Sequence, residues 1–109
     1  MTALLALVVA AIAALAPARI QVVADEFSYA LSRQTLKQGP ALIELANFGE
    51  DEHDLRLRRV GGTRTYAIGK VAPGERRTLE TKLRAGTFRL WCSVGDHRSR
   101  GMTATLRVR

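Results

Sequence analysis

The chain has 109 residues, of which 47% are hydrophobic and 25% are charged, and its formal net charge is +7. This length allows one domain and excludes a second folded core. The positive charge favours anionic partners, but aromatic residues are few and no nucleic-acid-binding motif is present, so no nucleic acid is expected as a partner.

Residues 1–18 are predicted to be a secretory signal peptide. They carry no charged side chain, Ala3–Leu15 is an unbroken apolar run, and Ala16-Pro17-Ala18 supplies small residues for cleavage. The run is short for a membrane span, which needs about 20 apolar residues. Retention as a membrane anchor is the alternative. We expect an exported protein, periplasmic or otherwise extracytoplasmic, whose domain covers residues 19–109.

The first half of this domain is predicted to form strands at Ile20–Ala24, around Phe27–Leu31 and at Ala41–Ala46. Alternation of leucine with charged residues predicts another strand over residues 53–58. Thr63–Lys70 has no clear period, and we expect it to be irregular or to contain a short helical turn.

The C-terminal half shows the two-residue period of half-buried strands over residues 78–84, 87–91 and 103–109. Turn dipeptides separate the predicted strands, at Gly39-Pro40, Gly61-Gly62, Pro73-Gly74 and Ala85-Gly86. About seven to eight short strands at this spacing predict an all-β fold, an antiparallel Greek-key β-sandwich.

Cys92 is the only cysteine of the chain. Cysteines of exported proteins normally pair, so a lone one is an intermolecular bridge, a reactive thiol or a metal ligand. Cys92 begins a Cys-x4-His-x4-Met series that continues with His97 and Met102, and the other histidine is His53. Two imidazoles, one thiolate and a weak axial thioether form the ligand set of a blue-copper electron-transfer site. We therefore predict one type 1 copper ion as cofactor.

The strand register directs three of these side chains inward, because side chains two residues apart share one face of a strand. Cys92, His53 and Met102 each continue the apolar face of a predicted strand at its end, and His97 lies in the loop between two of these strands. Taken singly, each residue type is more often ordinary core or surface than a ligand. A metal-free structural sandwich is therefore the competing interpretation.

Three polar neighbours are candidates for holding the ligands in place. Asp54 follows His53, Ser93 follows Cys92, and Asn47 ends a predicted strand. We expect Asp54 to join the two ligand segments by hydrogen bonds, with Asn47 and Ser93 in similar roles. Ordinary turn capping is the alternative for each of them.

Two blocks of the sequence resemble the cupredoxin family, and the resemblance covers essentially the whole mature chain. The blocks are Asn47-Phe48-Gly49 with His53-Asp54-Leu55, and Trp91-Cys92-Ser93-Val94 with His97 and Gly101-Met102. The resemblance implies a copper-binding Greek-key β-sandwich of the plastocyanin-like kind, and the even Cys-His-Met spacing is similar to that of rusticyanin-like members. It also implies equatorial copper ligands at His53, Cys92 and His97, with Met102 as the axial ligand.

These observations predict a one-electron carrier that cycles between Cu(I) and Cu(II). In the family, electrons usually pass through the exposed edge of the second histidine ligand, here His97. Arg98 and Arg100 flank this loop, so we expect a redox protein partner with an acidic docking face. The carrier is expected to be a monomer.

Two other functions compete with electron transfer. A copper-binding module for copper handling or resistance would use the same ligands without a redox partner. An enzyme is not expected, because a catalytic copper would need further histidines and both histidines of the chain are already used.

Overall fold

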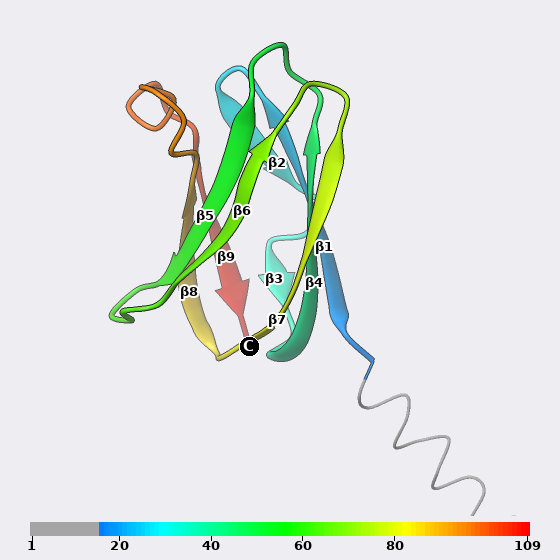
Figure 1. Cartoon of the computed structure of the whole chain (residues 1–109). Coiled ribbons are helices and arrows are strands. Elements are labelled where there is room, and N and C mark those ends of the chain that lie inside the picture. Colours follow the sequence, from blue (N-terminus) through cyan, green and yellow to red (C-terminus); the bar gives the residue numbers. More distant parts are fainter. Residues whose placement is uncertain (1–15) are drawn as a thin grey trace, which may run out of the picture.

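A computed structural model describes residues 16–109 (Figure 1). It is a sandwich of two β-sheets, with strand order β2-β1-β4-β7 in one sheet and β3-β9-β8-β5-β6 in the other. The strands are β1 (Ala18–Asp25), β2 (Ser28–Leu31), β3 (Thr35–Leu36), β4 (Gly39–Asn47), β5 (His53–Arg59), β6 (Thr65–Val71), β7 (Arg76–Leu83), β8 (Gly86–Trp91) and β9 (Thr103–Val108). The predicted all-β sandwich is confirmed.

The predicted leader falls almost entirely on residues 1–15, which lie outside the described residues. Ala18, its last residue, already belongs to β1 and pairs with Ala41 of β4. Within residues 16–109, no helix is long and apolar enough to cross a membrane.

The sheets are mixed, and this corrects the antiparallel prediction. β1 pairs with β4 in parallel, and β3 pairs with β9 in parallel. The remaining pairings of the described strands are antiparallel. A two-residue period decides which face a side chain takes, but it does not carry the direction of the neighbouring strand.

The prediction for Thr63–Lys70 was wrong, because most of this stretch belongs to β6, at the edge of the second sheet. The β5–β6 register shifts between His53 and Leu55, so β6 has one more residue than β5 at this point. Such a bulge breaks the two-residue alternation, which is why Ile68 and Val71 are both buried although they are three residues apart.

Apolar side chains from both sheets fill the space between them. Strands β1 and β4 contribute Val22, Ile43 and Leu45, and strands β5, β8 and β9 contribute Leu55, Leu57, Phe88, Leu90 and Leu106. The ends of these strands carry the predicted ligands. The β1–β2 turn, the β4–β5 loop and the β8–β9 loop all lie at the end of the sandwich opposite the C-terminus (Figure 1).

Candidate metal centre

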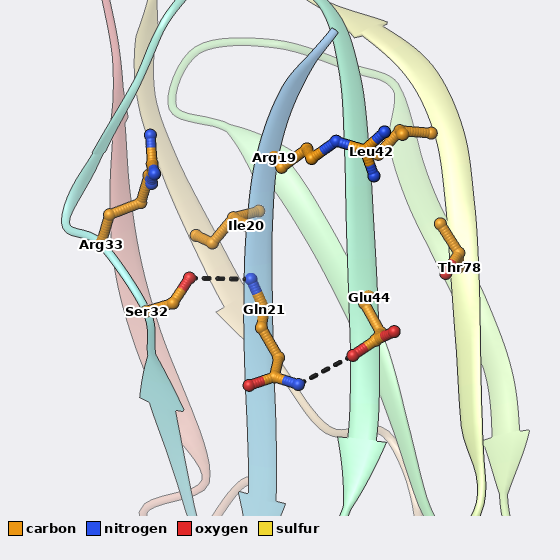
Figure 2. Close-up of a pocket in the computed structure, with 8 residues that line it drawn as sticks. All are labelled: Arg19, Ile20, Gln21, Ser32, Arg33, Leu42, Glu44 and Thr78. Atoms are coloured by element: carbon orange, nitrogen blue, oxygen red, sulfur yellow. Dashed lines mark hydrogen bonds between the residues drawn. The ribbon is translucent and has the colours of Figure 1, made fainter.

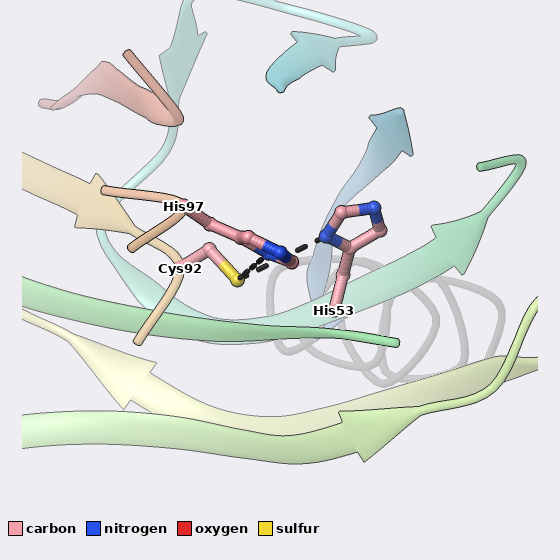
Figure 3. Close-up of side chains that lie close together, drawn as sticks. All are labelled: His53, Cys92 and His97. Carbon is pink, nitrogen blue, oxygen red and sulfur yellow. Dashed lines mark hydrogen bonds between the residues drawn. The ribbon is translucent and has the colours of Figure 1, made fainter. Parts of the chain in front are cut away.

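Three of the four predicted ligands converge at this end of the core. The side chains of His53, Cys92 and His97 point toward one another (Figure 3), and one ligand atom from each lies within 4.8 Å of the others. His53 and Cys92 are fully buried, and His97 is 7% exposed. Residues that are far apart in the sequence therefore form one compact buried donor set.

The donor spacing fits a single metal ion. The Cys92 Sγ atom lies 3.9 Å from His53 Nδ1 and 3.6 Å from His97 Nδ1. Metal–nitrogen bonds of about 2.0 Å and metal–sulfur bonds of about 2.3 Å, set at trigonal angles, place two ligand atoms about 3.7 Å apart. One thiolate with two imidazoles is a donor set that suits copper.

The environment of Cys92 favours a thiol unless a cation is present. Desolvation by burial raises the pKa of Cys92 above its ordinary value, and the Asp54 amide opposes the rise. A buried thiolate therefore needs a neighbouring positive charge, and metal binding to this side chain releases a proton. This chemistry favours a metal ligand over a freely reactive thiol.

Met102 is also fully buried, at the start of the segment that leads into β9. Its amide donates to the His97 carbonyl at 3.2 Å, and its carbonyl accepts from the Cys92 amide at 3.2 Å. The backbone of Met102 is thus tied directly to two of the three clustered ligands. The burial of Met102 matches the inward direction that the strand register predicts for its side chain.

His97 is held by the turns of the β8–β9 loop. Its amide donates to the Val94 carbonyl at 3.0 Å, and its carbonyl accepts from the amides of Arg100 and Met102. The Phe27 ring packs against the imidazole with centroids 4.8 Å apart. The resemblance implied an exposed edge, whereas here Phe27 and the surrounding loops leave little of His97 open to solvent.

Each ligand imidazole has a carboxylate at its second nitrogen, which sequence reasoning missed. His53 Nε2 lies 3.1 Å from Glu26 Oε1, and His97 Nε2 lies 3.4 Å from Asp51 Oδ2. Glu26 lies in the β1–β2 turn, far from the ligand motifs in sequence. No spacing rule links a turn glutamate to a histidine on another strand, so only the fold reveals the contact.

Glu26 is ionised in this setting. The Asp51 and Glu50 amides donate to its carboxylate and, together with His53, hold the pKa of Glu26 at about 2, against the desolvation that raises it. The Asp51 hydrogen bond is the largest of these contributions. A full negative charge therefore stands at the His53 ring.

Asp54 joins the two ligand segments. Its Oδ1 atom accepts from the Ser93 amide at 2.7 Å, and its Oδ2 atom accepts from the Ser93 hydroxyl. The Tyr29 hydroxyl donates to the Asp54 carbonyl, and burial raises the pKa of Tyr29, which keeps this donor protonated. Asp54 therefore connects three parts of the chain: strand β5, strand β2 and the segment after Cys92.

Asn47 organises the β4–β5 loop from the end of β4. Its Nδ2 atom donates to the carbonyls of Asp51 and Val71 at 2.7 and 2.9 Å. Its Oδ1 atom accepts from the Gly49 amide at 2.8 Å. A buried side chain that satisfies three backbone groups shapes the loop immediately before His53.

The two predicted docking residues, Arg98 and Arg100, are exposed on the β8–β9 loop. The Arg98 guanidinium stacks 4.6 Å from the Trp91 ring centroid. Arg100 pairs with Asp96 at 2.9 Å and lies over Phe27. Because Arg100 already has an acidic partner, Arg98 is the freer of the two charges.

A shallow pocket of about 310 Å³ lies elsewhere, along β1 and β4 of the four-stranded sheet (Figure 2). The Gln21 backbone amide donates to the Ser32 hydroxyl oxygen at 2.8 Å, and its side-chain amide donates to Glu44 at 2.8 Å. It includes none of the converging ligands, so the buried donor set is the better candidate for function.

Several solved structures have a fold similar to that of this chain. A reduced auracyanin from the photosynthetic bacterium Roseiflexus castenholzii matches with a TM-score of 0.69 and 15% identity, over 84% of this chain and 96% of that chain. Auracyanin A, a blue copper protein from Chloroflexus aurantiacus, matches with a TM-score of 0.69 and 16% identity, over 86% of this chain and 100% of that chain. Amicyanin from Paracoccus versutus matches with a TM-score of 0.59 and 12% identity, over 84% and 81%.

These proteins are cupredoxins. The chain has the cupredoxin fold. No protein-family model and no curated protein sequence matches it. At such low identity the likeness establishes the cupredoxin fold alone, so the chemistry of the centre is argued from the residues of this chain.

Proposed function

We propose that the chain is a type 1 copper protein that carries one electron at a time between exported or membrane-bound redox partners. The observation that carries this proposal is the convergence of His53, Cys92 and His97 at one buried end of the sandwich. The auracyanin A structure, which has the same fold, is described as a blue copper protein. That likeness supports the same cofactor here.

His53, Cys92 and His97 would be the equatorial ligands, with Met102 as the axial ligand. Copper bound there would supply a one-electron couple between Cu(II) and Cu(I). The sheet ends and the Asp54–Ser93 bonds hold the ligands in a fixed arrangement. The apolar core below them excludes water. Both features suit electron transfer, because the ligands need to move little when the charge changes.

The charge of the surface supports an acidic redox partner. The formal net charge is +7, and Arg98 and Arg100 are exposed beside the centre. An acidic docking face on the partner would be steered toward this loop. Both histidines of the chain belong to the candidate centre, which leaves no imidazole for a second, catalytic copper. We therefore propose a carrier rather than an enzyme.

The decisive experiment is a visible absorption spectrum of the folded domain, residues 19–109, during addition of Cu(II). An intense blue band that saturates at one copper per chain is expected. Cys92→Ser should abolish the band, because the thiolate-to-copper transition is then lost. A wild-type protein that stays colourless would refute the proposal.

Copper handling without a redox partner is the alternative use of the same ligands. Slow copper loss to a chelator together with rapid reduction and reoxidation supports the carrier. Rapid copper loss to the chelator would favour the copper-handling module.

A further inference from the structure

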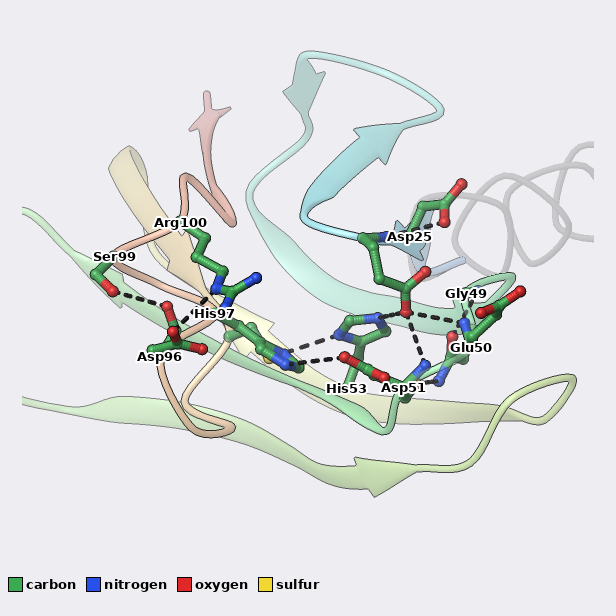
Figure 4. A network of polar contacts seen from close by, with 12 residues as sticks. Asp25, Gly49, Glu50, Asp51, His53, Asp96, His97, Ser99 and Arg100 are labelled. Atoms are coloured by element: carbon green, nitrogen blue, oxygen red, sulfur yellow. Dashed lines mark hydrogen bonds and ion pairs between the residues drawn. The ribbon is translucent and has the colours of Figure 1, made fainter.

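The two ligand imidazoles differ in how their second nitrogen is held (Figure 4). The Nε2 atom of His53 lies within hydrogen-bond distance of Glu26, at 3.1 Å, whereas that of His97 lies 3.4 Å from Asp51 without a hydrogen bond. We propose that Glu26 is a positioning residue for His53, and that its charge lowers the reduction potential of the centre. This inference rests on the proposed function, since a potential exists only with copper bound.

Backbone amides of the β4–β5 loop hold the carboxylate of Glu26 in place. Its Oε1 atom accepts from the amides of Glu50 and Asp51, at 2.8 and 2.7 Å, in addition to its contact with His53. The Glu26 side chain is 26% exposed. Two of its three donors come from the loop that leads into β5, and the third is His53, the first residue of β5. The loop immediately before His53 therefore fixes the carboxylate against the imidazole.

Gly49 makes room for this arrangement. A Cβ atom at position 49 would lie 2.5 Å from Glu26 Oε1, a separation that Cβ atoms essentially never show, so the carboxylate would have to shift. Asn47 holds the Gly49 amide at 2.8 Å, so the loop does not move away freely. An alanine at position 49 would displace the carboxylate while leaving every charge in place.

The contact with Glu26 decides which nitrogen of His53 faces the centre. A carboxylate accepts only, so the hydrogen of a neutral imidazole stays on Nε2 and the lone pair stays on Nδ1. Nδ1 is the atom that lies 3.9 Å from the Cys92 sulfur. The adjacent charge also makes the imidazole a stronger donor. A stronger donor favours the more highly charged Cu(II) over Cu(I), which lowers the potential.

Asp51 should also lower the reduction potential, through His97, but by less than Glu26 does. Its side chain is 50% exposed, its contact is longer, and no hydrogen bond joins it to the ring. Solvent screens an exposed charge more than a shielded one. Asp51→Asn should therefore change the potential less than a change at Glu26.

The test compares the potentials of four forms of the copper-loaded domain by voltammetry. Glu26→Gln removes the charge and keeps an acceptor, Gly49→Ala keeps the charge and displaces it, and Glu52→Gln is the control. Glu52 is exposed and directly precedes His53. Its substitution therefore removes a nearby charge without changing a residue that contacts an imidazole. Glu26→Gln should change the ratio of Cu(I) to Cu(II) affinity about tenfold, which raises the potential by about 59 mV.

Gly49→Ala should raise the potential in the same direction, and Glu52→Gln should leave it nearly unchanged. Equal shifts of the reduction potential in Glu26→Gln and Glu52→Gln would overturn the role of Glu26 in setting the potential. A Gly49→Ala potential equal to wild type would overturn the requirement for the close contact. A colourless wild-type protein would instead refute the proposed copper site, so the two failures are distinguishable.

The positioning role has a second readout that needs no copper. Nitrogen-15 NMR of the metal-free domain should show His53 as the Nε2–H tautomer in wild type and Glu26→Gln. Gly49→Ala and Glu26→Ala should increase the population of the Nδ1–H tautomer. An unchanged His53 tautomer in both of these variants would overturn the positioning role.

Discussion

The metal centre combines a strand-anchored half with a loop-anchored half. His53 begins β5, and its ring is held by Glu26. His97 lies in the β8–β9 loop, where turn hydrogen bonds and the Phe27 ring hold it. Sheet pairing forms with the fold itself, whereas a loop is ordered by fewer contacts. We therefore expect the strand-anchored half of the centre to depend less on the bound metal than the loop-anchored half.

Removal of copper should have the largest effect on stability. This effect should be concentrated in the β8–β9 loop. Copper at 1,000 times its dissociation constant should stabilise the fold by about 4 kcal/mol, because it binds the folded form. The gain in amide protection should concentrate in residues 92–102 rather than in β5. Denaturant unfolding and hydrogen exchange, with and without Cu(I), measure both quantities. An equal gain in β5 and in the loop would contradict the comparison.

Asp54→Ala tests the junction between the two halves. This change removes a buried carboxylate that accepts from the Ser93 amide and hydroxyl. The free energy of unfolding of the metal-free domain should fall by about 2 kcal/mol, the range for hydrogen bonds to a charged group. Urea denaturation measures it.

Ser93→Ala is the matched control for the Asp54 prediction. It removes the hydroxyl but keeps the amide donor, so it should cost less than Asp54→Ala. A loss in Ser93→Ala as large as that in Asp54→Ala would show that the backbone bond contributes nothing.

Met102→Leu tests the loop-anchored half of the centre. A leucine of similar volume should cost less than about 1.5 kcal/mol of stability. Copper should remain bound and blue, but the potential should shift because the thioether is lost. Voltammetry and the visible spectrum measure the outcome. Complete loss of copper binding would contradict an axial, weakly bound role for Met102.

Arg98→Glu should have the smallest effect on the fold and act instead on association. The stacking on Trp91 is worth about 1 kcal/mol or less at an exposed position. Electron transfer with an acidic redox protein should slow, and its dependence on ionic strength should weaken. Stopped-flow kinetics over a range of salt concentrations measure this.

Arg84→Glu is the charge-matched control, because Arg84 is exposed in the turn between β7 and β8 at the opposite end of the sandwich. It changes the net charge equally but lies far from the metal loop. Identical salt dependences for the Arg84 and Arg98 variants would show that only net charge steers the partner.

The sequence predicted most of the sandwich because alternation of apolar and polar residues reports local backbone geometry. Phe88 and Leu90, for example, are both buried as their period requires. The pattern failed at residues 65–71, where a bulge breaks the alternation. It also missed β3, whose two residues are too few to show a period. The alternation likewise could not predict that β1 pairs with β4 in parallel.

The ligand motif was visible in the sequence because soft sulfur and imidazole donors are rare and chemically specific. The residue types and their spacing identify Cys92, His53, His97 and Met102 as candidate ligands and place three of the four on inward strand registers. The carboxylates that contact the two imidazoles are visible only once the chain is folded. Glu26 reaches His53, and Asp51 reaches His97, because separate segments meet at one end of the sandwich. Such contacts depend on how distant loops pack, and no local period or spacing encodes that.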